Sequence, residues 1–460
     1  MAGWDTLENM LREEIKQRGE EGCNVAGFAE RLAQSPKDKA SLDALYDELM
    51  ALTISADFAY DEPSDWAGIQ AALPKATTAG VAAGTIDKDR FSGAWLGRAC
   101  GCALGKPVEA GDFMAGKGDM PGWQCVYEWF KGADAYPIKG YTPEQSRAAD
   151  EFGLSLTQWS KKSVREHIQF MESDDDIRYT VLGLVMMEEA GLDWEPLNIG
   201  HLWSRYLPVY TVCTAERQAY INYMQSLDML GHEPSAEQKA SFLDWVRTHR
   251  NPYREWIGAQ IRVDGYAYAA AGNPALAAEL AWRDSAFSHI KNGIYGAMMI
   301  SAMIAAAFVE KDNMKIIEAG LAQIPANCRL AHAIKEAIVI AEGASDELDL
   351  VAKLWNAFGN YHCVHTINNA ALCVAALIFA GDDYEKAITT AVLCGWDTDC
   401  NGATVGSIMG AKLGTSAIPS YWSEPLHDTL YSAIPDFHPI AISAFSDRCY
   451  ELYRKISAQK

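Results

Sequence analysis

Long apolar stretches rich in Ala, Gly, Met and Leu constrain the fold of this chain most. They are VLGLVMMEEAG (181–191), GIYGAMMISAMIAAAF (293–308), INNAALCVAALIFAG (367–381), KAITTAVLCG (386–395) and ATVGSIMGAKLG (403–414). Beta-branched residues do not alternate with polar ones over any useful length, so strands are poorly supported. Helices with this many small residues pack closely on several sides. We therefore predict an all-α fold, with a compact many-helix domain that carries its site on the loops between helices.

Residues 1–85 are more charged and contain fewer glycines than the rest. LENMLREEIKQRGEE (7–21) and SLDALYDELMALTIS (41–55) carry apolar residues at three- and four-residue spacing, which predicts two amphipathic helices. Pro and Gly around 61–85 indicate a connection. We predict a small helical N-terminal extension, residues 1–85, laid against a main domain of residues 86–460. Scattered aromatics, Gly and Pro in 111–170 predict an irregular segment, either near the site or a surface loop.

The charge balance limits the partners of the chain. Its 460 residues include 39 Lys and Arg against 61 Asp and Glu, a net charge of −22. This charge repels nucleic acid and anionic membrane surfaces, so we expect neither as a partner. If the substrate is a phosphate, the site must supply positive charge locally, from a metal ion, Arg or Lys, or a helix N-terminus.

The compartment is predicted from the N-terminus and the cysteines. The N-terminal residues are charged from the fifth onward and lack the apolar core of a signal peptide. Eleven cysteines without an export signal are most simply reduced thiols in a cytoplasm. The uncharged run 292–309 is long enough to consider a membrane span. Because Asn292, Ser301 and several glycines interrupt it, we expect a buried core helix instead.

Four polar residues, Ser173-Asp174-Asp175-Asp176, precede the apolar run that starts at Ile177. Asp and Ser cap helix N-termini because their oxygens accept the free N–H groups of the first turn. One cap needs one such residue. The cluster is therefore either an over-acidic cap or a functional site.

A second acidic cluster lies in LCGWDTDCNG, residues 393–402. Asp397 and Asp399 are two residues apart, the wrong spacing to share a helix face, so we expect them on a loop. Behind them, glycines recur every four residues from Gly402 to Gly414 and predict a close approach to a neighbouring helix. If two such acidic loops face each other, they need cations between them or raised pKa values. Carboxylates and hydroxyls suit Mg²⁺, Mn²⁺ or Ca²⁺ rather than Zn²⁺.

The third cluster is GCALGKPVE, residues 101–109. Its glycines predict a tight bend, its proline stops the preceding helix, and Glu109 is either a solvated turn residue or part of a site. The cysteines offer another interpretation, because Cys100-x-Cys102 and Cys394-x₅-Cys400 resemble parts of a zinc site. Neither has the paired C-x₂-C spacing that identifies such sites, so we interpret them as small core residues.

Taken in chain order, the three clusters resemble the ADP-ribosylglycohydrolase family, which includes the dinitrogenase-reductase-activating glycohydrolases. That family has a Gly-Asp-x-Leu-Gly…Glu motif, a Thr-Asp-Asp-Thr motif and a Gly-x-Asp-Thr-Asp-Thr motif. This chain has GCALGKPVE, SDDD and GWDTDC at the corresponding places, and the likeness covers roughly residues 87–420. The resemblance implies an all-α fold, one or two divalent ions (Mg²⁺ or Mn²⁺), and cleavage of the N- or O-glycosidic bond at C1″ of ADP-ribose.

The resemblance also implies roles for individual residues. The implied metal ligands are Ser173, Asp174, Asp175, Asp397 and Asp399. Glu109 faces the substrate, and Glu109, Asp174 or Asp175 would act as the general acid or base. Three departures from the motifs bear on the metals: Ser173 stands in place of the first Thr of the middle motif and keeps the hydroxyl, Asp176 stands in place of its second Thr, and Cys400 in place of the last Thr. Cys102 also replaces the Asp of the first motif. A thiol is a poor ligand for Mg²⁺, so the Cys400 position puts a second metal in doubt.

Further stretches resemble a long-chain bacterial branch of the same family. They are EWIGAQIRVDGYAY (255–268), WRDSAFSHIKNGIYGAMM (282–299) and NYHCVHTINNAA (360–371). Their polar residues are candidate substrate-binding groups, or members of an internal ion-pair and hydrogen-bond network. These residues are Gln260, Arg262, Asp264, His289, Lys291, Asn292, His365 and Asn368.

The sequence therefore predicts a cytoplasmic glycosidase acting on an ADP-ribosyl or related ribosyl group of a protein or small molecule. Two alternatives stay open at this point. One is a hydrolase of a small N-glycoside or nucleoside-like metabolite on the same fold. The other is a non-catalytic relative that binds ADP-ribose.

Overall fold

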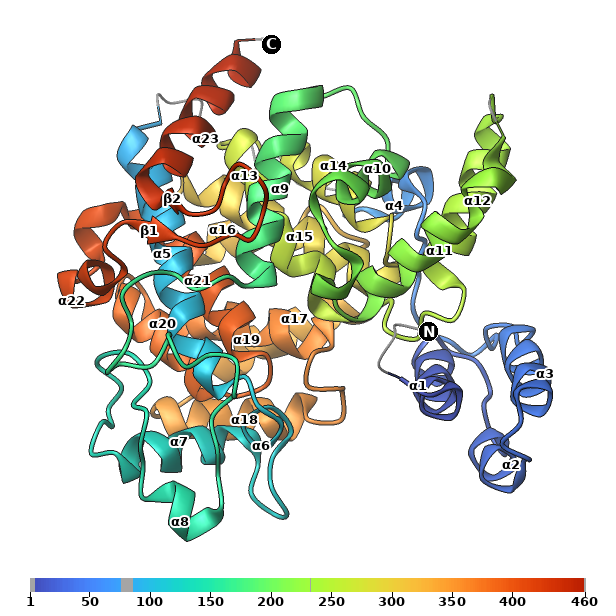
Figure 1. Cartoon of the computed structure of the whole chain (residues 1–460), viewed down its shortest axis with the longest axis horizontal. Coiled ribbons are helices and arrows are strands. Elements are labelled where there is room, and N and C mark those ends of the chain that lie inside the picture. The colour runs from blue at the N-terminus through green and yellow to red at the C-terminus, as the bar shows by residue number, and fades with distance from the viewer. Residues whose placement is uncertain (1–4, 76–85, 232, 459–460) are drawn as a thin grey trace.

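The computed structural model describes residues 5–75, 86–231 and 233–458, and the prediction of an all-α fold is confirmed (Figure 1). The N-terminal helices are α1 (Leu7–Glu20), α2 (Phe28–Gln34), α3 (Lys39–Met50) and α4 (Trp66–Ala72). Next come α5 (Lys88–Gly105), η1 (Lys106–Val108), α6 (Gly111–Ala115), α7 (Gly122–Gly132), α8 (Ala148–Phe152), α9 (Asp175–Ala190), α10 (Leu197–Tyr206), η2 (Val209–Thr211), α11 (Thr214–Leu230) and α12 (Ala236–Thr248).

The second half is also helical. Its helices are η3 (Ile257–Arg262), α13 (Asp264–Ala269), α14 (Pro274–Ser285), α15 (Lys291–Ala307), α16 (Asn313–Leu321), α17 (Arg329–Glu342), α18 (Glu347–Phe358), α19 (Thr366–Ala380), α20 (Tyr384–Leu393), α21 (Thr398–Leu413), η4 (Thr415–Ala417), α22 (Ser420–Ser423), η5 (Glu424–Leu426) and α23 (Ile442–Ser457). Two short antiparallel strands, β1 (Thr429–Leu430) and β2 (Ile440–Ala441), pair with Thr429 opposite Ala441.

Helices α5 and α21 pack against each other along glycines, near the centre of the main body in Figure 1. A Cβ added at Gly101 would lie 2.0 Å from the carbonyl oxygen of Gly402, and one added at Gly97 would lie 2.2 Å from that of Gly406. The helices run antiparallel, since Gly93 meets Gly410 at the other end of the contact. The predicted close approach along this stripe is therefore present. It brings the end of α5 beside the start of α21.

This packing corrects two local predictions. The bend expected in GCALG is absent, because Gly101 and Gly105 belong to α5 and serve its contact with α21 rather than a turn. Asp397 and Asp399 do not both lie on a loop either. Asp397 is the N-cap residue of α21, and Asp399 lies in its first turn. The first turn of a helix has no preceding turn to satisfy its N–H groups, so carboxylates are favourable there.

The core of the main body contains α15, which is buried along its whole length. The prediction of a buried core helix at 292–309 is confirmed for residues 292–307, which belong to α15. In the part of the chain that the structure describes, no helix combines the length and the hydropathy that crossing a bilayer requires.

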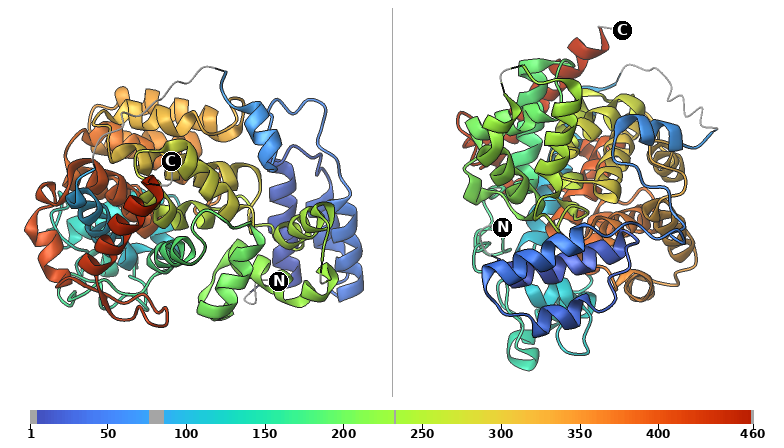
Figure 2. Two further views of the ribbon diagram at one scale, coloured as in Figure 1. Left: turned by 90° about the horizontal axis from the view of Figure 1, so that it is seen from above. Right: turned by 90° about the vertical axis from the view of Figure 1, so that its right-hand side faces the viewer.

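Helices α1, α2 and α3 lie together at one side of the molecule, in dark blue in Figures 1 and 2. They share an apolar cluster of their own, made of Met10, Leu11, Phe28, Leu32, Leu42, Leu45, Tyr46 and Leu49. The predicted connection around 61–85 contains α4, and residues 76–85 of it lie outside the described residues. The 111–170 segment holds α6, α7 and α8 between irregular stretches, and its Trp159 lines a cavity described below.

Candidate metal and substrate site

The three acidic segments predicted from the sequence meet at one place. Asp174 is the N-cap of α9 and accepts a hydrogen bond from the backbone N–H of Asp176 at 3.1 Å. The start of α21 is tied to the end of α5 by Thr398, whose Oγ1 donates to the carbonyl oxygen of Gly105 at 2.9 Å. Two helix N-termini and the segment after α5 therefore converge, which is why residues far apart in sequence form one acidic cluster.

A cavity of about 550 Å³ opens over this cluster. Among the described residues it is lined by Lys106, Glu109, Trp159, Ser173, Asp174, Asp175, Arg178, Cys213, Thr214, Glu216, Arg217, Trp256, Ile257, Gly258, Ile261, Val364, Asp397 and Cys400. Its size suits a ligand of nucleotide dimensions. All the predicted catalytic and metal residues except Asp399 therefore line the same space, and a ligand atom of Asp399 lies within 4.8 Å of those of Asp397 and Cys400, which do line it.

Lys106 places an ammonium group inside the acidic cluster. Its Nζ forms a salt bridge with Oδ2 of Asp174, and both side chains are buried. Burial alone would raise the pKa of Asp174, but the Lys106 ammonium reverses this and holds that pKa below its usual range. Burial likewise opposes the charge on Lys106, yet the carboxylate of Asp174 raises the pKa of Lys106. The two side chains form a stable ion pair.

The other carboxyls of the cluster have raised pKa values. Burial, followed by the charge of Asp174, raises the pKa of Asp175 to about 8 and that of Asp399 to about 7. Burial and the charge of Asp399 raise the pKa values of Asp397 and Glu109 well above their usual range. Burial is the largest cause of each shift and a neighbouring carboxylate the next, so ionising these carboxyls together is unfavourable without an added cation.

Unpartnered oxygens test whether a cation fits. Asp397 and Asp399 are only 4% and 2% exposed, and Oδ1 of each is buried without a hydrogen-bond partner. Buried carboxylate oxygens without a partner are costly unless a cation neutralises them. Ligand atoms of Asp397, Asp399 and Cys400 lie within 4.8 Å of one another. The oxygens fit a hard divalent ion such as Mg²⁺ or Mn²⁺.

The four cysteines whose spacing resembles parts of a zinc site are buried, as expected for small core residues, although Cys400 also lines the cavity. All eleven cysteines are free, and Cys100, Cys102, Cys394 and Cys400 are buried. Burial raises the pKa values of the Cys102 and Cys400 thiols well above their usual range. Both are therefore neutral thiols, which are poor ligands for a hard cation.

The eight predicted substrate-binding residues are buried and engaged in contacts within the protein. None of them lines the cavity among the described residues. Arg262 binds Asp284 and donates to Oε1 of Glu216 at 2.8 Å. Asp264 pairs with Nη1 of Arg98 at 3.1 Å. The remaining members of this network are His289, hydrogen-bonded to Ser288 at 2.8 Å, and Gln260, which accepts from Thr366 at 2.9 Å.

The other four of these residues lie toward the N-terminal helices and the 360–365 loop. Lys291 donates from Nζ to the carbonyl oxygen of Glu21 at 3.5 Å, and Asn292 donates to Oε1 of Glu255 at 3.0 Å. His365 lies 3.5 Å from Glu20, and Asn368 donates to the carbonyl oxygen of His362 at 3.3 Å. These contacts fit the internal network that the sequence left open as the alternative.

Several cavity residues were not singled out from the sequence. The cations among them are Lys106, Arg178 and Arg217, and the aromatic ones are Trp159 and Trp256. Arg178 follows the acidic run by two residues and lies one helical turn after Asp174. This spacing could have indicated that its side chain lies near the same site. Trp159, which is 67% exposed, lies in an irregular segment whose sequence carries no such signal.

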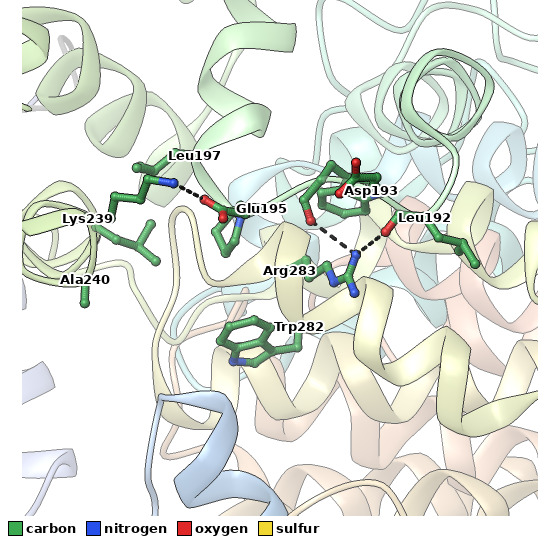
Figure 3. Close-up of a pocket in the computed structure, with 11 residues that line it drawn as sticks. Leu192, Asp193, Glu195, Leu197, Lys239, Ala240, Trp282 and Arg283 are labelled. Carbon is green, nitrogen blue, oxygen red and sulfur yellow. Dashed lines mark hydrogen bonds and ion pairs between the residues drawn. The ribbon is translucent and has the colours of Figure 1, made fainter. Parts of the chain in front are cut away.

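A second cavity, of about 390 Å³, lies between α10, α12 and α14 (Figure 3). Its polar side chains are engaged in contacts with the protein. Arg283 donates to the carbonyl oxygens of Leu192 and Trp194, and Lys239 pairs with Glu195 at 2.8 Å. Because no acidic ligand cluster of the described residues lies there, the candidate chemistry belongs to the first cavity.

The fold and the site together define an all-α protein with a buried carboxylate cluster suited to a hard cation. The family model described as ADP-ribosylglycohydrolase matches residues 83–457, and the chain belongs to that family. Membership supports a glycosidase-type hydrolase in general. A solved structure titled "ADP-ribosylglycohydrolase-related protein complex" is similar at 20% identity, with 80% of this chain and 98% of that chain covered and a TM-score of 0.47. No curated protein matches the chain.

Proposed function

We propose that this chain is a metal-dependent hydrolase that cleaves the glycosidic bond at C1″ of an ADP-ribosyl or related ribosyl group. One observation carries the proposal: a cavity of about 550 Å³ has Ser173, Asp174, Asp175 and Asp397 in its wall together with arginines. Carboxylates bind a cation, and a cation together with carboxylates stabilises the positive charge of an oxocarbenium-like transition state and the sugar hydroxyls around it.

The residues would divide the work as follows. Asp397 and Asp399 hold the cation, with Ser173 and Asp175 on the facing helix start. A bound Mg²⁺ or Mn²⁺ would act as a Lewis acid toward the ribosyl group. Glu109 lines the cavity, and burial followed by the charge of Asp399 raises the pKa of its carboxyl, which favours the protonated form. It is therefore suited to donate that proton to the leaving group.

The walls of the cavity supply contacts for a nucleotide. Arg178 and Arg217 line it, in a protein whose net charge is −22. Their guanidinium groups would bind a diphosphate, as arginines commonly bind phosphate. Trp256 also lines the cavity and stacks on His362 with 4.0 Å between ring centroids, and Trp159 is exposed at it. Either indole offers a stacking surface for a base.

The test is a substrate panel with a chelator. ADP-ribosylated proteins, O-acyl ADP-ribose and small N-ribosides are incubated with the full chain and Mn²⁺ or Mg²⁺, and release of ADP-ribose or ribose is measured. We expect turnover that EDTA abolishes and that Asp397→Ala and Asp174→Ala reduce strongly. Glu195→Gln, at the second cavity, is the matched control and should leave turnover unchanged. Full, chelator-resistant activity in Asp397→Ala would contradict the proposal.

The panel also separates the two alternatives. Turnover of small N-ribosides alone would identify a small-molecule N-glycosidase. Tight ADP-ribose binding without turnover at saturating Mn²⁺ would identify a non-catalytic relative. The ion pair between Lys106 and Asp174 is the observation that keeps the second alternative worth testing, because it neutralises one of the proposed ligands.

We further propose that residues 1–85 are a structural extension of a catalytic domain of residues 86–460, and that the chain acts in the cytoplasm. The separate apolar cluster of α1–α3 supports the first proposal. Eleven free cysteines support a reducing compartment.

A further inference from the structure

Lys106 lies inside the acidic cluster and lines the cavity above it. It follows α5 directly, in η1, one helical turn after Cys102. Its side chain is 5% exposed and forms a salt bridge with Asp174. Asp174 belongs to a group whose other members are Cys102, Asp176 and Asp399, and the ligand atoms of the four lie within 4.8 Å of one another. The ammonium therefore neutralises one member of this group.

Asp176 of this deep group also has a protein cation beside it, although its Oδ2 is buried without a hydrogen-bond partner. Oδ1 of Asp176 lies 3.0 Å from Nη2 of Arg98, which is completely buried and shared with Asp264. Cys102 contributes a neutral thiol, a soft ligand that does not suit Mg²⁺. Of the four donors, two have a protein cation beside them and one is a thiol. An additional divalent ion in this group would lie against the fixed charges of Lys106 and Arg98.

The second group differs in this respect. Asp397 and Asp399 each keep a buried oxygen without a partner, and no Lys or Arg of the described residues forms a salt bridge with either side chain. Asp399 belongs to both groups, so an ion held here also lies beside the deep group, and the charge of Lys106 acts on Asp399 as well. Two carboxylates carry two negative charges, which one divalent ion neutralises. Asp397 also reaches the cavity, so the ion would face the substrate.

We propose that the Lys106 ammonium is the permanent cation of the deep group, and that the chain consequently binds one exchangeable divalent ion, held by Asp397 and Asp399. The inference rests on the proposed function only in that it takes the cluster to be a divalent-metal site. It assigns Lys106 a positioning role: the ammonium holds Asp174 at the start of α9 whether or not a divalent ion is bound.

The stoichiometry of Mn²⁺ binding tests this directly. The full chain is stripped with EDTA, dialysed against Mn²⁺, and bound Mn²⁺ is counted by the loss of the free-ion electron paramagnetic resonance signal. We expect one Mn²⁺ per wild-type chain. The variant Lys106→Met/Cys102→Asp removes the ammonium and adds a carboxylate, and should bind two. Lys412→Met is the matched control, since Lys412 is equally buried but pairs with Asp382 at the far end of α21; it should bind one.

Melting in EDTA gives an independent measurement. Lys106→Met leaves the carboxylate of Asp174 buried without its cation, so its melting temperature in EDTA should fall below that of the wild type. Excess Mn²⁺ should raise the melting temperature of Lys106→Met by more than it raises that of Lys412→Met. Two Mn²⁺ ions on the wild-type chain would overturn the inference, and so would a folded double variant that binds only one.

The outcome is distinguishable from failure of the proposed function. A chain that binds one Mn²⁺ but hydrolyses no member of the substrate panel sustains this inference and contradicts the function. Turnover by a chain that carries two Mn²⁺ ions supports the proposed function and contradicts this inference.

Discussion

Glu109 is the carboxyl best placed to move a proton in the cavity. It lines the cavity and its pKa is raised by burial and then by the charge of Asp399. Glu109→Gln keeps the size of the side chain and removes the proton. We expect kcat/KM on the active substrate of the panel to fall by about 10²–10⁴-fold, the usual contribution of a general acid or base.

The pH profile provides the control for this role. A general acid works in its protonated form, so wild-type activity should fall as the pH rises through the raised pKa of Glu109. Glu109→Gln should lose this decline and still bind the wild-type amount of Mn²⁺. An unchanged pH profile in the variant would assign the decline to another group.

Asp175 and Asp399 predict how metal-free stability depends on pH. Their pKa values in the folded chain, about 8 and about 7, exceed the usual value of 3.8 because burial and the charge of Asp174 disfavour ionisation. The folded chain therefore holds more protons than the unfolded chain between about pH 4 and pH 8, and its stability falls as the pH rises through that window. In EDTA the melting temperature should be lower at pH 8.5 than at pH 6.

A divalent ion should reverse this trend. Its carboxylate ligands must be deprotonated, so binding releases protons and strengthens as the pH rises. The increase in melting temperature on adding Mn²⁺ should therefore be larger at pH 8.5 than at pH 6. Asp399→Asn cannot ionise there and should show a weaker pH dependence in EDTA. Equal Mn²⁺ shifts at both pH values would argue against carboxylate ligands with raised pKa values.

At the scale of single residues, the sequence identified the acidic groups but not their neutralising partners. Asp174 and Asp175 are identifiable because the run of four polar residues, 173–176, exceeds what one helix cap requires. Asp397 is identifiable because a second aspartate lies two residues after it. Lys106 is not, because a lysine beside a turn is usually solvated. Its partner Asp174 lies 68 residues away, and only the tertiary structure brings the two together.

At the scale of elements, the contact between α5 and α21 sets the geometry of the site. Gly101→Ala places a Cβ 2.0 Å from the backbone oxygen of Gly402, which no side-chain movement relieves. Overpacking of this kind costs about 1–3 kcal/mol or more in the free energy of unfolding, because two helices must separate. The start of α21 would move with its helix, so Mn²⁺ affinity should fall as well. Urea unfolding and Mn²⁺ titration measure the two effects.

Gly111→Ala is the control for this substitution. A Cβ there meets nothing within 4 Å, and the residue opens the short helix α6 with an ordinary backbone conformation. We expect unchanged stability and Mn²⁺ affinity. If Gly101→Ala unfolds at the same urea concentration as Gly111→Ala, the close approach of the two helices is not essential.

The glycine stripe also shows what could be predicted about elements. The four-residue spacing from Gly402 to Gly414 correctly indicated a close helix contact. The matching stripe from Gly93 to Gly105 has the same spacing, but Gly101 and Gly105 were assigned to a turn because a proline follows them. Local turn chemistry and helix packing use the same residue, and only the partner helix decides between them. The register of the contact, which places Thr398 on Gly105, is a property of the folded pair.

At the scale of the molecule, α1 is joined to the main body by buried charges. Nη2 of Arg254 lies 2.7 Å from Glu14 and 2.7 Å from Glu21, and Gln17 of α1 donates to Glu255 at 3.0 Å. Arg254 immediately precedes the segment that carries Trp256 in the cavity wall. The amphipathic pattern predicted α1 itself, but its contact with the body uses polar residues that the pattern assigns to solvent. This arrangement makes the N-terminal helices a support for one wall of the cavity.

Arg254→Met tests that role of the N-terminal helices. Arg254 is 1% exposed, and its loss leaves the carboxylate of Glu14 buried without its cation and leaves Glu21 with Arg18 alone. Breaking a buried pair in this way costs about 3–5 kcal/mol, so we expect a lower melting temperature and proteolysis between the N-terminal helices and the body. Because Trp256 lies two residues away, ADP-ribose affinity should also fall. Arg454→Met, which breaks an exposed pair with Glu451, should change none of the three. An Arg254→Met protein with wild-type melting and protease resistance but weakened ADP-ribose binding would show that Arg254 shapes the cavity without anchoring the extension.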